Sequence, residues 1–141
     1  MAESRPNASL IKQIHDRLEK RANNSLRAQD LTMMQVSVLI ALHYSERQQL
    51  SMKELERRFG VAQSTVAGII SRLEQKGLIE ALSDPEDKRV KLVHITQTGE
   101  TCYAEAAGSM QEAEETLLDG LSDEERTTLN RLLIRIAGNL E

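Results

Sequence analysis

One predicted helix of this chain carries side chains that can hydrogen-bond to nucleic-acid bases along one side. Its apolar residues recur with helical spacing over about residues 62–76, at Val66, Ile69, Ile70 and Leu73. At about 100° per residue, the opposite side is small and polar, with Ser64, Gly68, Ser71 and Gln75 at its centre and Gln63, Thr65 and Arg72 at its margins. Such a side would let the helix backbone lie close to base edges in the major groove of a duplex.

Gly68 lies in the middle of this polar side. A glycine in a helix interior costs about 1 kcal/mol relative to alanine, so its presence usually has a reason. One reason is the close approach of a DNA duplex. The other is structural, either packing against a second helix or simple tolerance, and the sequence leaves both explanations open.

A hairpin is predicted directly after this helix. Two short segments rich in β-branched residues, 78–82 and 90–95, flank a polar turn in which Pro85 favours a type I conformation. Apolar residues occupy both alternating sets of the second segment, so the sequence does not say which face of the hairpin is buried.

Charged residues gather at the tip of this hairpin. We expect Lys88 or Arg89 to reach phosphates or the minor groove, while Asp87 or Asp84 accepts hydrogen bonds from Arg89 and braces the turn. The alternative is a solvated turn with no partner. Further basic residues near the same unit are candidates for phosphate contact or for a plain solvated surface: Lys53, Arg57, Arg58 and Lys76.

The histidines and the single cysteine are too dispersed to form a catalytic or zinc site. They fall on different predicted elements: His15, His43, His94 and Cys102. No motif links a nucleophile to a base, and no two histidines lie four residues apart on a helix. We expect His43 to pack on an apolar helix face and Cys102 to be a mostly buried thiol. The sequence therefore predicts no enzyme, no cofactor and no metal site.

Helices position most of these residues. Capping boxes, in which Ser or Thr precedes Gln or Glu by three residues, mark helix starts at Thr32, Ser51 and Ser122. The predicted helices cover about residues 8–29, 32–44, 51–59, 62–76, 96–119 and the segment after Ser122, with Gly60 ending the third. This order predicts a mainly α fold with a small β-hairpin wing (α+β), a winged helix-turn-helix.

Composition and charge limit the partners. The 141 residues include 18 basic and 22 acidic ones, but residues 99–141 hold only three of the basic and ten of the acidic groups. A negatively charged partner would therefore meet the first two thirds of the chain. Three aromatic residues are too few to stack single-stranded bases. The polar N-terminus, the single cysteine and the lack of a long apolar stretch favour a cytoplasmic protein.

We expect one domain over residues 1–141, in which a DNA-binding lobe of about 31–98 lies between dimerisation helices of about 8–30 and 99–141. The terminal helices carry apolar stripes that include Leu10, Ile14 and Leu18 at one end and Leu129, Leu133, Ile136 and Leu140 at the other. A lobe of this size cannot cover both stripes, so we predict a homodimer.

The stretch from Leu31 to Gly99 resembles the MarR family of bacterial winged-helix regulators. It carries LTMMQVSVLIAL, then LSMKELERRFGVAQSTVAGIISRLEQKGLIE, then SDPEDKRVKLVHITQTGE, of which the DPEDKR wing and the ITQTG helix start are the more discriminating parts. The resemblance implies a dimer that reads a pseudo-palindromic operator in double-stranded DNA, usually as a repressor released by a small molecule or by oxidation. The alternative is a winged-helix module that contacts proteins and has no operator of its own.

The resemblance also implies roles for particular residues. Those that fall where such proteins read the major groove are Gln63, Ser64, Thr65, Gly68, Ser71 and Arg72. Asp87 and Arg89 fall at the positions of the family's Asp and Arg pair in the wing. Candidates for the wall of an effector pocket are His15, Met34 and His43. The chain departs from the family at Ala62, where a helix-capping residue is common, and at Ala81, where arginine is frequent.

Overall fold

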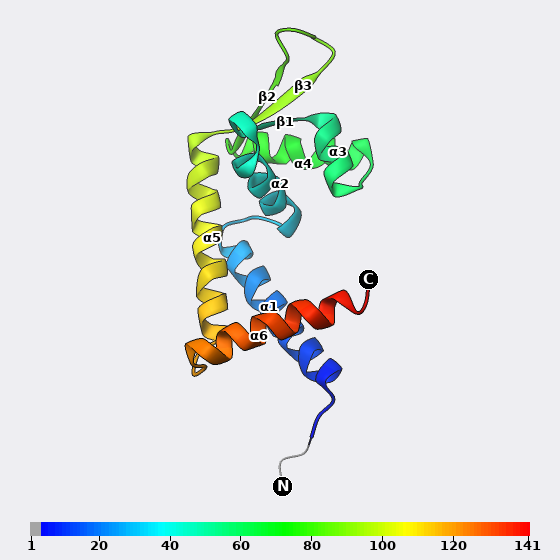
Figure 1. The fold of residues 1–141 in the computed structure, drawn as a ribbon. Helices are drawn as coiled ribbons and strands as arrows, with labels where there is room; N and C mark the ends of the chain where they lie inside the picture. The colour runs from blue at the N-terminus through cyan, green and yellow to red at the C-terminus, as the bar shows by residue number, and fades with distance from the viewer. Residues whose placement is uncertain (1–3) are drawn as a thin grey trace. The chain divides into compact units, whose positions relative to one another are not determined.

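Helices make up most of the chain in the computed structural model, which describes residues 4–141 (Figure 1). In chain order the elements are α1 (Asn7–Ala28), α2 (Met33–Tyr44), the 3-10 turn η1 (Glu46–Gln48), β1 (Gln49–Ser51), α3 (Met52–Phe59), α4 (Gln63–Gln75), β2 (Ile79–Ser83), β3 (Lys91–Ile95), α5 (Gln97–Leu117) and α6 (Asp123–Gly138). The mainly helical fold with a small antiparallel sheet confirms the prediction. The helix boundaries lie within about two residues of the expected ones.

The three predicted capping boxes are formed. The side chains of Thr32, Ser51 and Ser122 each accept a hydrogen bond from the backbone N–H three residues later, and the side chain at that position returns one. These bonds satisfy N–H groups that have no partner within the helix. Gly60 ends α3 with φ of 60°, in the left-handed region that glycine enters without steric cost.

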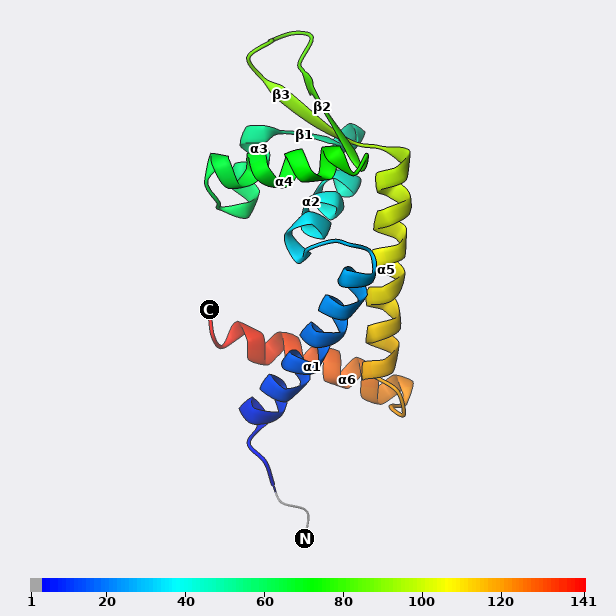
Figure 2. The same cartoon turned by 180° about the vertical axis from the view of Figure 1, so that it is seen from behind.

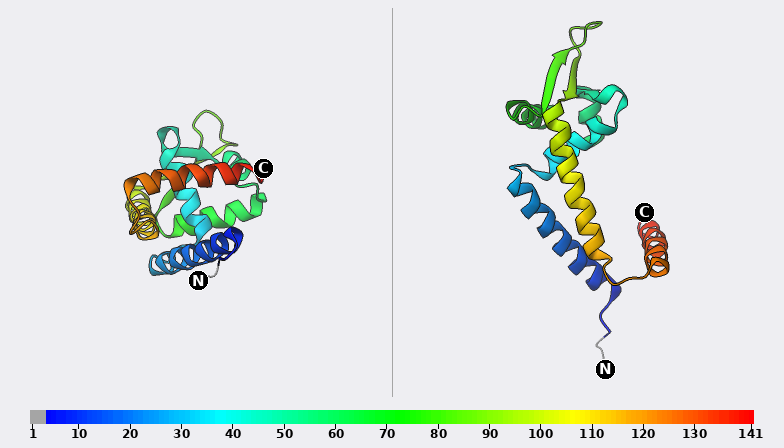
Figure 3. Two further views of the ribbon diagram at one scale, coloured as in Figure 1. Left: turned by 60° about the horizontal axis from the view of Figure 1, so that its bottom comes forward. Right: turned by 90° about the vertical axis from the view of Figure 1, so that its left-hand side faces the viewer.

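The sheet has three antiparallel strands in the order β1-β3-β2, because the short strand β1 pairs with β3 alongside the predicted hairpin. The sequence did not predict β1. Ile79 of β2 and Val93 of β3 are fully buried, which identifies the face of the hairpin that packs on the helices. β2 packs against α4 and β3 against α2, while the far end of the hairpin stands clear of the helices (Figure 3).

The core of this lobe is aliphatic, as the scarcity of aromatic residues requires. Its largest fully buried side chains are Leu39, Leu42, Leu55, Leu73, Ile79, Val38 and Val93. They come from α2, α3, α4 and the two strands of the hairpin, so α4 is fixed in the lobe by its apolar side. Seen from behind, α4 lies on the outside of the lobe (Figure 2).

The chain divides into two units within α5, one ending at Ser109 and the other running from Met110 to Glu141. In the first unit, Leu26 is the one buried residue of α1, while Ile11 and Ile14 are exposed. In the second unit, α6 has no buried residue. Its exposed apolar side chains are Leu132, Leu133, Ile134 and Ile136, and Leu140 is exposed just after the helix. No helix among residues 4–141 is long and apolar enough to cross a membrane.

Candidate nucleic-acid interface

The outer side of α4 is small, polar and exposed. All of the residues predicted to read a groove are exposed on this helix: Gln63, Ser64, Thr65, Gly68, Ser71 and Arg72. On the other side of the helix, Val66, Ile70 and Leu73 are buried in the core. The 100° periodicity in the sequence therefore separates the two sides of α4 correctly.

The surroundings of Gly68 remove one explanation for this residue. A Cβ atom built on Gly68 would meet no described protein atom within 4 Å. No helix of residues 4–141 thus packs on this position, and a requirement for tight packing within the chain does not account for the glycine. Close approach of an external partner and simple tolerance remain.

Ala62 stands at the N-cap of α4 and offers no side-chain hydrogen bond to the helix. The first backbone N–H groups of α4 therefore lack the cap that serines and threonines give to α2, α3 and α6. Uncapped N–H groups at the positive end of a helix favour an anionic partner such as a phosphate.

Arg72 lies one turn before the end of α4. Within the part of the chain that the structure describes, its guanidinium has no hydrogen-bond or ion-pair partner, although the residue lines a polar cavity of about 350 Å³. Five donors in a planar fork are thus available for a guanine edge or a phosphate.

The expected brace in the wing is present. Arg89 donates from Nε to Oδ1 of Asp87 at 3.1 Å and from Nη2 to Oδ2 at 3.3 Å, and the Arg89 backbone N–H also bonds Oδ1 at 3.1 Å. The bonds from the Arg89 side chain, followed by the one from its backbone, lower the pKa of Asp87. Asp84 instead accepts from the backbone N–H of Glu86 at 2.9 Å, so Asp87 is the acceptor that braces Arg89.

Lys88 is exposed at the tip of the wing, between Asp87 and Arg89 in the sequence. The wing strand β2 carries Ala81, whose backbone N–H donates to Glu74 of α4 at 3.0 Å. β2 has no basic residue, so the exposed basic groups of the wing are Lys88 and Arg89 at its tip and Lys91 at the start of β3.

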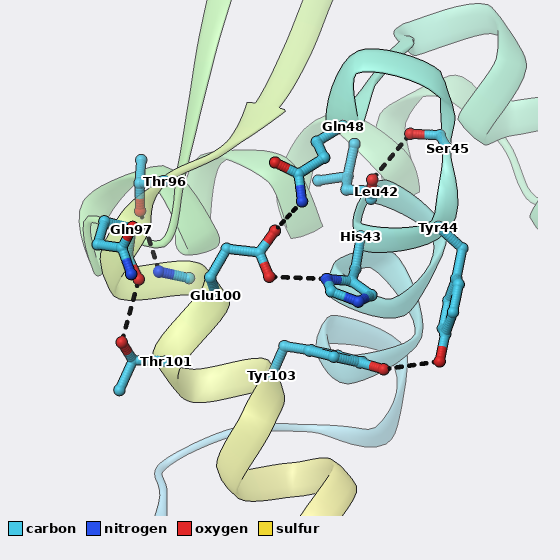
Figure 4. Close-up of polar contacts among 11 residues, drawn as sticks. Leu42, His43, Tyr44, Ser45, Gln48, Thr96, Gln97, Glu100, Thr101 and Tyr103 are labelled. Atoms are coloured by element: carbon cyan, nitrogen blue, oxygen red, sulfur yellow. Dashed lines mark hydrogen bonds and ion pairs between the residues drawn. The ribbon is translucent and has the colours of Figure 1, made fainter.

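The three effector-pocket candidates lie in different surroundings. His15 is exposed on α1, with its Nε2 3.6 Å from a carboxylate oxygen of Glu19 on the same helix. Met34 is half-buried in the first turn of α2. His43, in the last turn of α2, places Nδ1 2.7 Å from Oε2 of Glu100 on α5 (Figure 4). No polar contact joins the three residues within the described chain, and their grouping stays a prediction.

A polar and aromatic cluster around His43 was not predicted. Glu100 accepts from Gln48 at 2.6 Å in addition to its contact with His43, and the His43 ring stacks on Tyr103 with centroids 3.9 Å apart. The Tyr103 hydroxyl donates to the hydroxyl of Tyr44 at 2.9 Å, which raises the pKa of Tyr103 (Figure 4). These partners lie more than fifty residues apart in the sequence, so no local pattern could have indicated the cluster.

Cys102 is half-buried and packs against the lobe core. Burial, followed by the nearby Glu105 carboxylate, raises the pKa of its thiol. A thiol with a raised pKa is a poor nucleophile at neutral pH. The sequence predicted a mostly buried thiol, and the structure shows a half-buried one that packs against the core.

One group of possible metal ligands occurs among residues 4–141, at His15, Asp16 and Glu19, whose ligand atoms lie within 4.8 Å of one another. All three side chains are exposed on one face of α1. Asp16 is engaged with Lys12 at 2.7 Å. Exposed groups of this kind are common without an ion, and nothing else around them indicates one.

The short helix α3, the tight turn, the outward helix α4 and the braced hairpin together define a winged helix-turn-helix protein. A sequence model of the MarR family matches residues 29–90. The chain is 34% identical over 129 residues to the HTH-type transcriptional regulator YwoH of Bacillus subtilis, which covers 89% of this chain and 92% of that protein. The chain belongs to the MarR family and is a transcriptional regulator that binds DNA.

Two further similarities bear on function. The HTH-type transcriptional repressor IacR of Pseudomonas putida is 28% identical over 131 residues, covering 93% of this chain and 77% of that protein. The solved structure of BpsR from Bordetella bronchiseptica, whose DNA binding is regulated by 6-hydroxynicotinic acid, is similar with a TM-score of 0.68. It is 25% identical and covers 97% of this chain and 96% of its own. The family and the curated relatives YwoH and IacR are transcriptional regulators rather than enzymes.

Proposed function

We propose that this regulator binds a pseudo-palindromic operator in double-stranded DNA as a homodimer and represses transcription until a small-molecule effector releases it. The observation that carries the proposal is the outer side of α4, which is exposed and has open space above Gly68. A helix with a small polar side fits the major groove, where its side chains meet base edges.

The wing supports a second contact with the same duplex. Asp87 holds the guanidinium of Arg89 in place, and the Arg89 side chain is 91% exposed, so it can reach a phosphate or the minor groove. Base reading is then assigned to α4 and anchoring to the wing tip, Lys88 and Arg89.

Gly68→Ala should stabilise the protein and weaken operator binding. The added methyl group meets no protein atom, so we expect a gain of up to about 1 kcal/mol in the free energy of unfolding. In the complex the methyl group would hold the helix away from the base edges, and we expect a loss of roughly tenfold or more in affinity. Urea unfolding and fluorescence anisotropy on the operator measure the two effects.

Gly108→Ala is the matched control for this change. Gly108 is an exposed glycine within α5 whose built Cβ also meets no atom within 4 Å. It should stabilise the protein without changing operator affinity. If Gly68→Ala leaves operator affinity unchanged as well, α4 does not approach the duplex through Gly68.

Substitutions of Arg72 and Arg89 should separate base reading from anchoring. Arg72→Ala should weaken the free energy of operator binding by about 1 to 3 kcal/mol. It should also relax the preference for one base at one position of each half-site. Arg89→Ala should weaken binding to all duplexes by a similar factor. The slope of log affinity against log salt concentration should become flatter by about one for each phosphate that is no longer neutralised, hence by about two per dimer. Anisotropy over a salt series on operator and scrambled duplexes measures both.

The contact between Asp87 and Arg89 can be tested, because charge repulsion alone predicts that removing Asp87 tightens DNA binding. Asp87→Ala removes a negative charge but frees Arg89, so we expect weaker binding; Glu86→Ala removes a charge from the same tip without breaking a side-chain bond to Arg89. If Asp87→Ala instead tightens binding as much as Glu86→Ala does, the acidic tip only repels DNA.

Exposed apolar surface and charge support the homodimer. α1 exposes Ile11 and Ile14, and α6 exposes an apolar row, in each case within its own unit. Residues 7–28 hold five basic and two acidic groups, while residues 110–141 hold three basic and eight acidic groups. In a dimer, the apolar residues of these segments could be buried against the second copy. The basic segment 7–28 of one copy would also attract the acidic segment 110–141 of the other.

The names of the relatives support repression and its release. IacR is named a repressor, and BpsR is regulated by a small aromatic acid. His15, Met34 and His43 remain our candidates for an effector wall. A ligand can release the operator only through its differential affinity for the two forms of the protein. Small aromatic acids that raise thermal stability should therefore also weaken operator binding, and compounds that do the first without the second would contradict the effector proposal.

The experiment that tests DNA reading itself is salt-dependent gel retardation on the duplex upstream of the protein's own reading frame. Specific retention over scrambled duplexes, together with repression of a reporter behind that duplex, is the expected result. Equal binding to all duplexes would favour a winged-helix module that contacts other proteins.

A further inference from the structure

Lys76 directly follows α4, and its ammonium group binds the turn that joins α1 to α2. It donates to the backbone carbonyl oxygen of Asp30 and to Oε1 of Gln35 at 3.3 Å, and it lies 3.8 Å from the Asp30 carboxylate. Its side chain is 29% exposed. The sequence offered phosphate or solvent as its partner. The structure shows a third arrangement, in which the ammonium group hydrogen-bonds Asp30 and Gln35 of the same chain.

The turn that Lys76 binds has special backbone and packing. Asp30 adopts φ of 54°, a left-handed conformation that is uncommon for residues other than glycine. Gln35 is the one buried polar residue among those described, and its Oε1 also accepts the Thr32 backbone N–H at 3.1 Å in the cap of α2. The Gln35 Oε1 atom thus accepts hydrogen bonds both from Thr32 at the N-cap of α2 and from Lys76 at the end of α4.

α1 has few other attachments to the lobe. Leu26 in its last turn is its one buried residue, and Leu31 completes the joint with a backbone bond from its N–H to the Leu26 carbonyl at 2.9 Å. The direction of α1 relative to α4 therefore depends on the short turn 29–32 and on the contact with Lys76.

We propose that Lys76 is a positioning residue that sets the direction of α1 relative to α4 and thereby the half-site spacing that the dimer accepts. The inference rests on the proposed homodimer, in which the exposed side of α1 meets the second copy. A helix of 22 residues is about 33 Å long, so a rotation of about 10° at its base moves its far end by about 6 Å. That displacement is close to the rise of two base pairs, at about 3.4 Å each.

The test compares operators whose half-sites stand at the native spacing with operators that have one or two base pairs inserted or removed between them. The wild-type protein should lose at least about tenfold in affinity when the spacing changes. Lys76→Met, which keeps the length but removes the charge, should bind the native spacing more weakly and lose most of this discrimination. Lys76→Arg can still donate to Asp30 and Gln35 and should retain it.

A single half-site duplex serves as the internal control, because Lys76→Met should bind it as the wild type does. If Lys76→Met loses affinity equally at every spacing and on the half-site, with a flatter salt dependence, Lys76 is a phosphate contact and the proposal is wrong. If the wild type itself shows no preference for paired half-sites, the proposed dimeric reading fails instead, which is a distinguishable result.

A second measurement does not depend on DNA affinity. Spin labels placed at position 64 through Ser64→Cys, in a background with Cys102→Ser, report the distance between the two copies of α4 by pulsed electron resonance. Lys76→Met should broaden this distance distribution relative to the wild type and to Lys76→Arg. Identical, narrow distributions in all three proteins would overturn the proposal. If Lys76→Met does not fold, Lys76→Gln removes the same positive charge and takes its place.

Discussion

Replacing Gly99 with alanine should strongly destabilise the fold, because Gly99 is the one glycine of residues 4–141 whose added Cβ would clash with the protein. A Cβ atom at Gly99 would overlap the Leu78 carbonyl oxygen and lie 2.7 Å from Cγ1 of Ile95. The Leu78 carbonyl cannot move away easily, because it accepts the Thr96 backbone N–H at 3.0 Å and Leu78 itself is buried. Overpacking typically costs about 1 to 3 kcal/mol, and a clash with fixed backbone lies at or above the upper end.

Urea unfolding followed by circular dichroism measures this loss as a lower midpoint with an unchanged slope. Gly108→Ala is again the matched control, since the same methyl group on α5 meets no described atom and should be neutral or slightly stabilising. A Gly99→Ala protein as stable as the wild type would mean that α5 does not approach Leu78 as closely as the structure shows.

The double substitution Leu133→Glu with Ile136→Glu should convert the proposed homodimer to a monomer. Both side chains are exposed on α6, where they lie on one side of the helix. If a second copy covers this side, two carboxylates buried there without partners cost several kcal/mol. Operator affinity should then fall by roughly a hundredfold or more, because one chain engages only one half-site.

Sedimentation velocity at micromolar concentration measures the change in mass, and anisotropy measures operator binding. Arg131→Glu, which lies on the opposite side of α6 by helical periodicity, adds a carboxylate to the same helix and should remain dimeric. A double variant that stays dimeric would place the interface elsewhere.

The sequence predicted elements whose signals are local. The capping boxes at Thr32, Ser51 and Ser122 involve residues three positions apart, and each begins a helix where expected. Strand β1 escaped prediction because it has only three residues and forms by pairing with β3, about forty positions later. A strand that short shows no alternating pattern of its own.

The same distinction holds for the candidate site. The exposed side of α4 follows from its periodicity, and the brace between Asp87 and Arg89 joins residues two positions apart. The partners of Lys76 and Glu100 come from segments more than forty residues away, so their roles depend on tertiary structure. Gly99 marks a close approach that only the packed backbone reveals.

The two sides of α4 also bear on how this regulator can diverge. Val66, Ile70 and Leu73 hold the helix in the core, whereas the outer residues around Gly68 make no packing contribution that a substitution would destroy. Mutations on the outer side therefore escape the selection that purges destabilised proteins. A duplicated gene could acquire a new target sequence through a few outward changes while its product keeps folding, so the scaffold and its genetic targets can evolve independently.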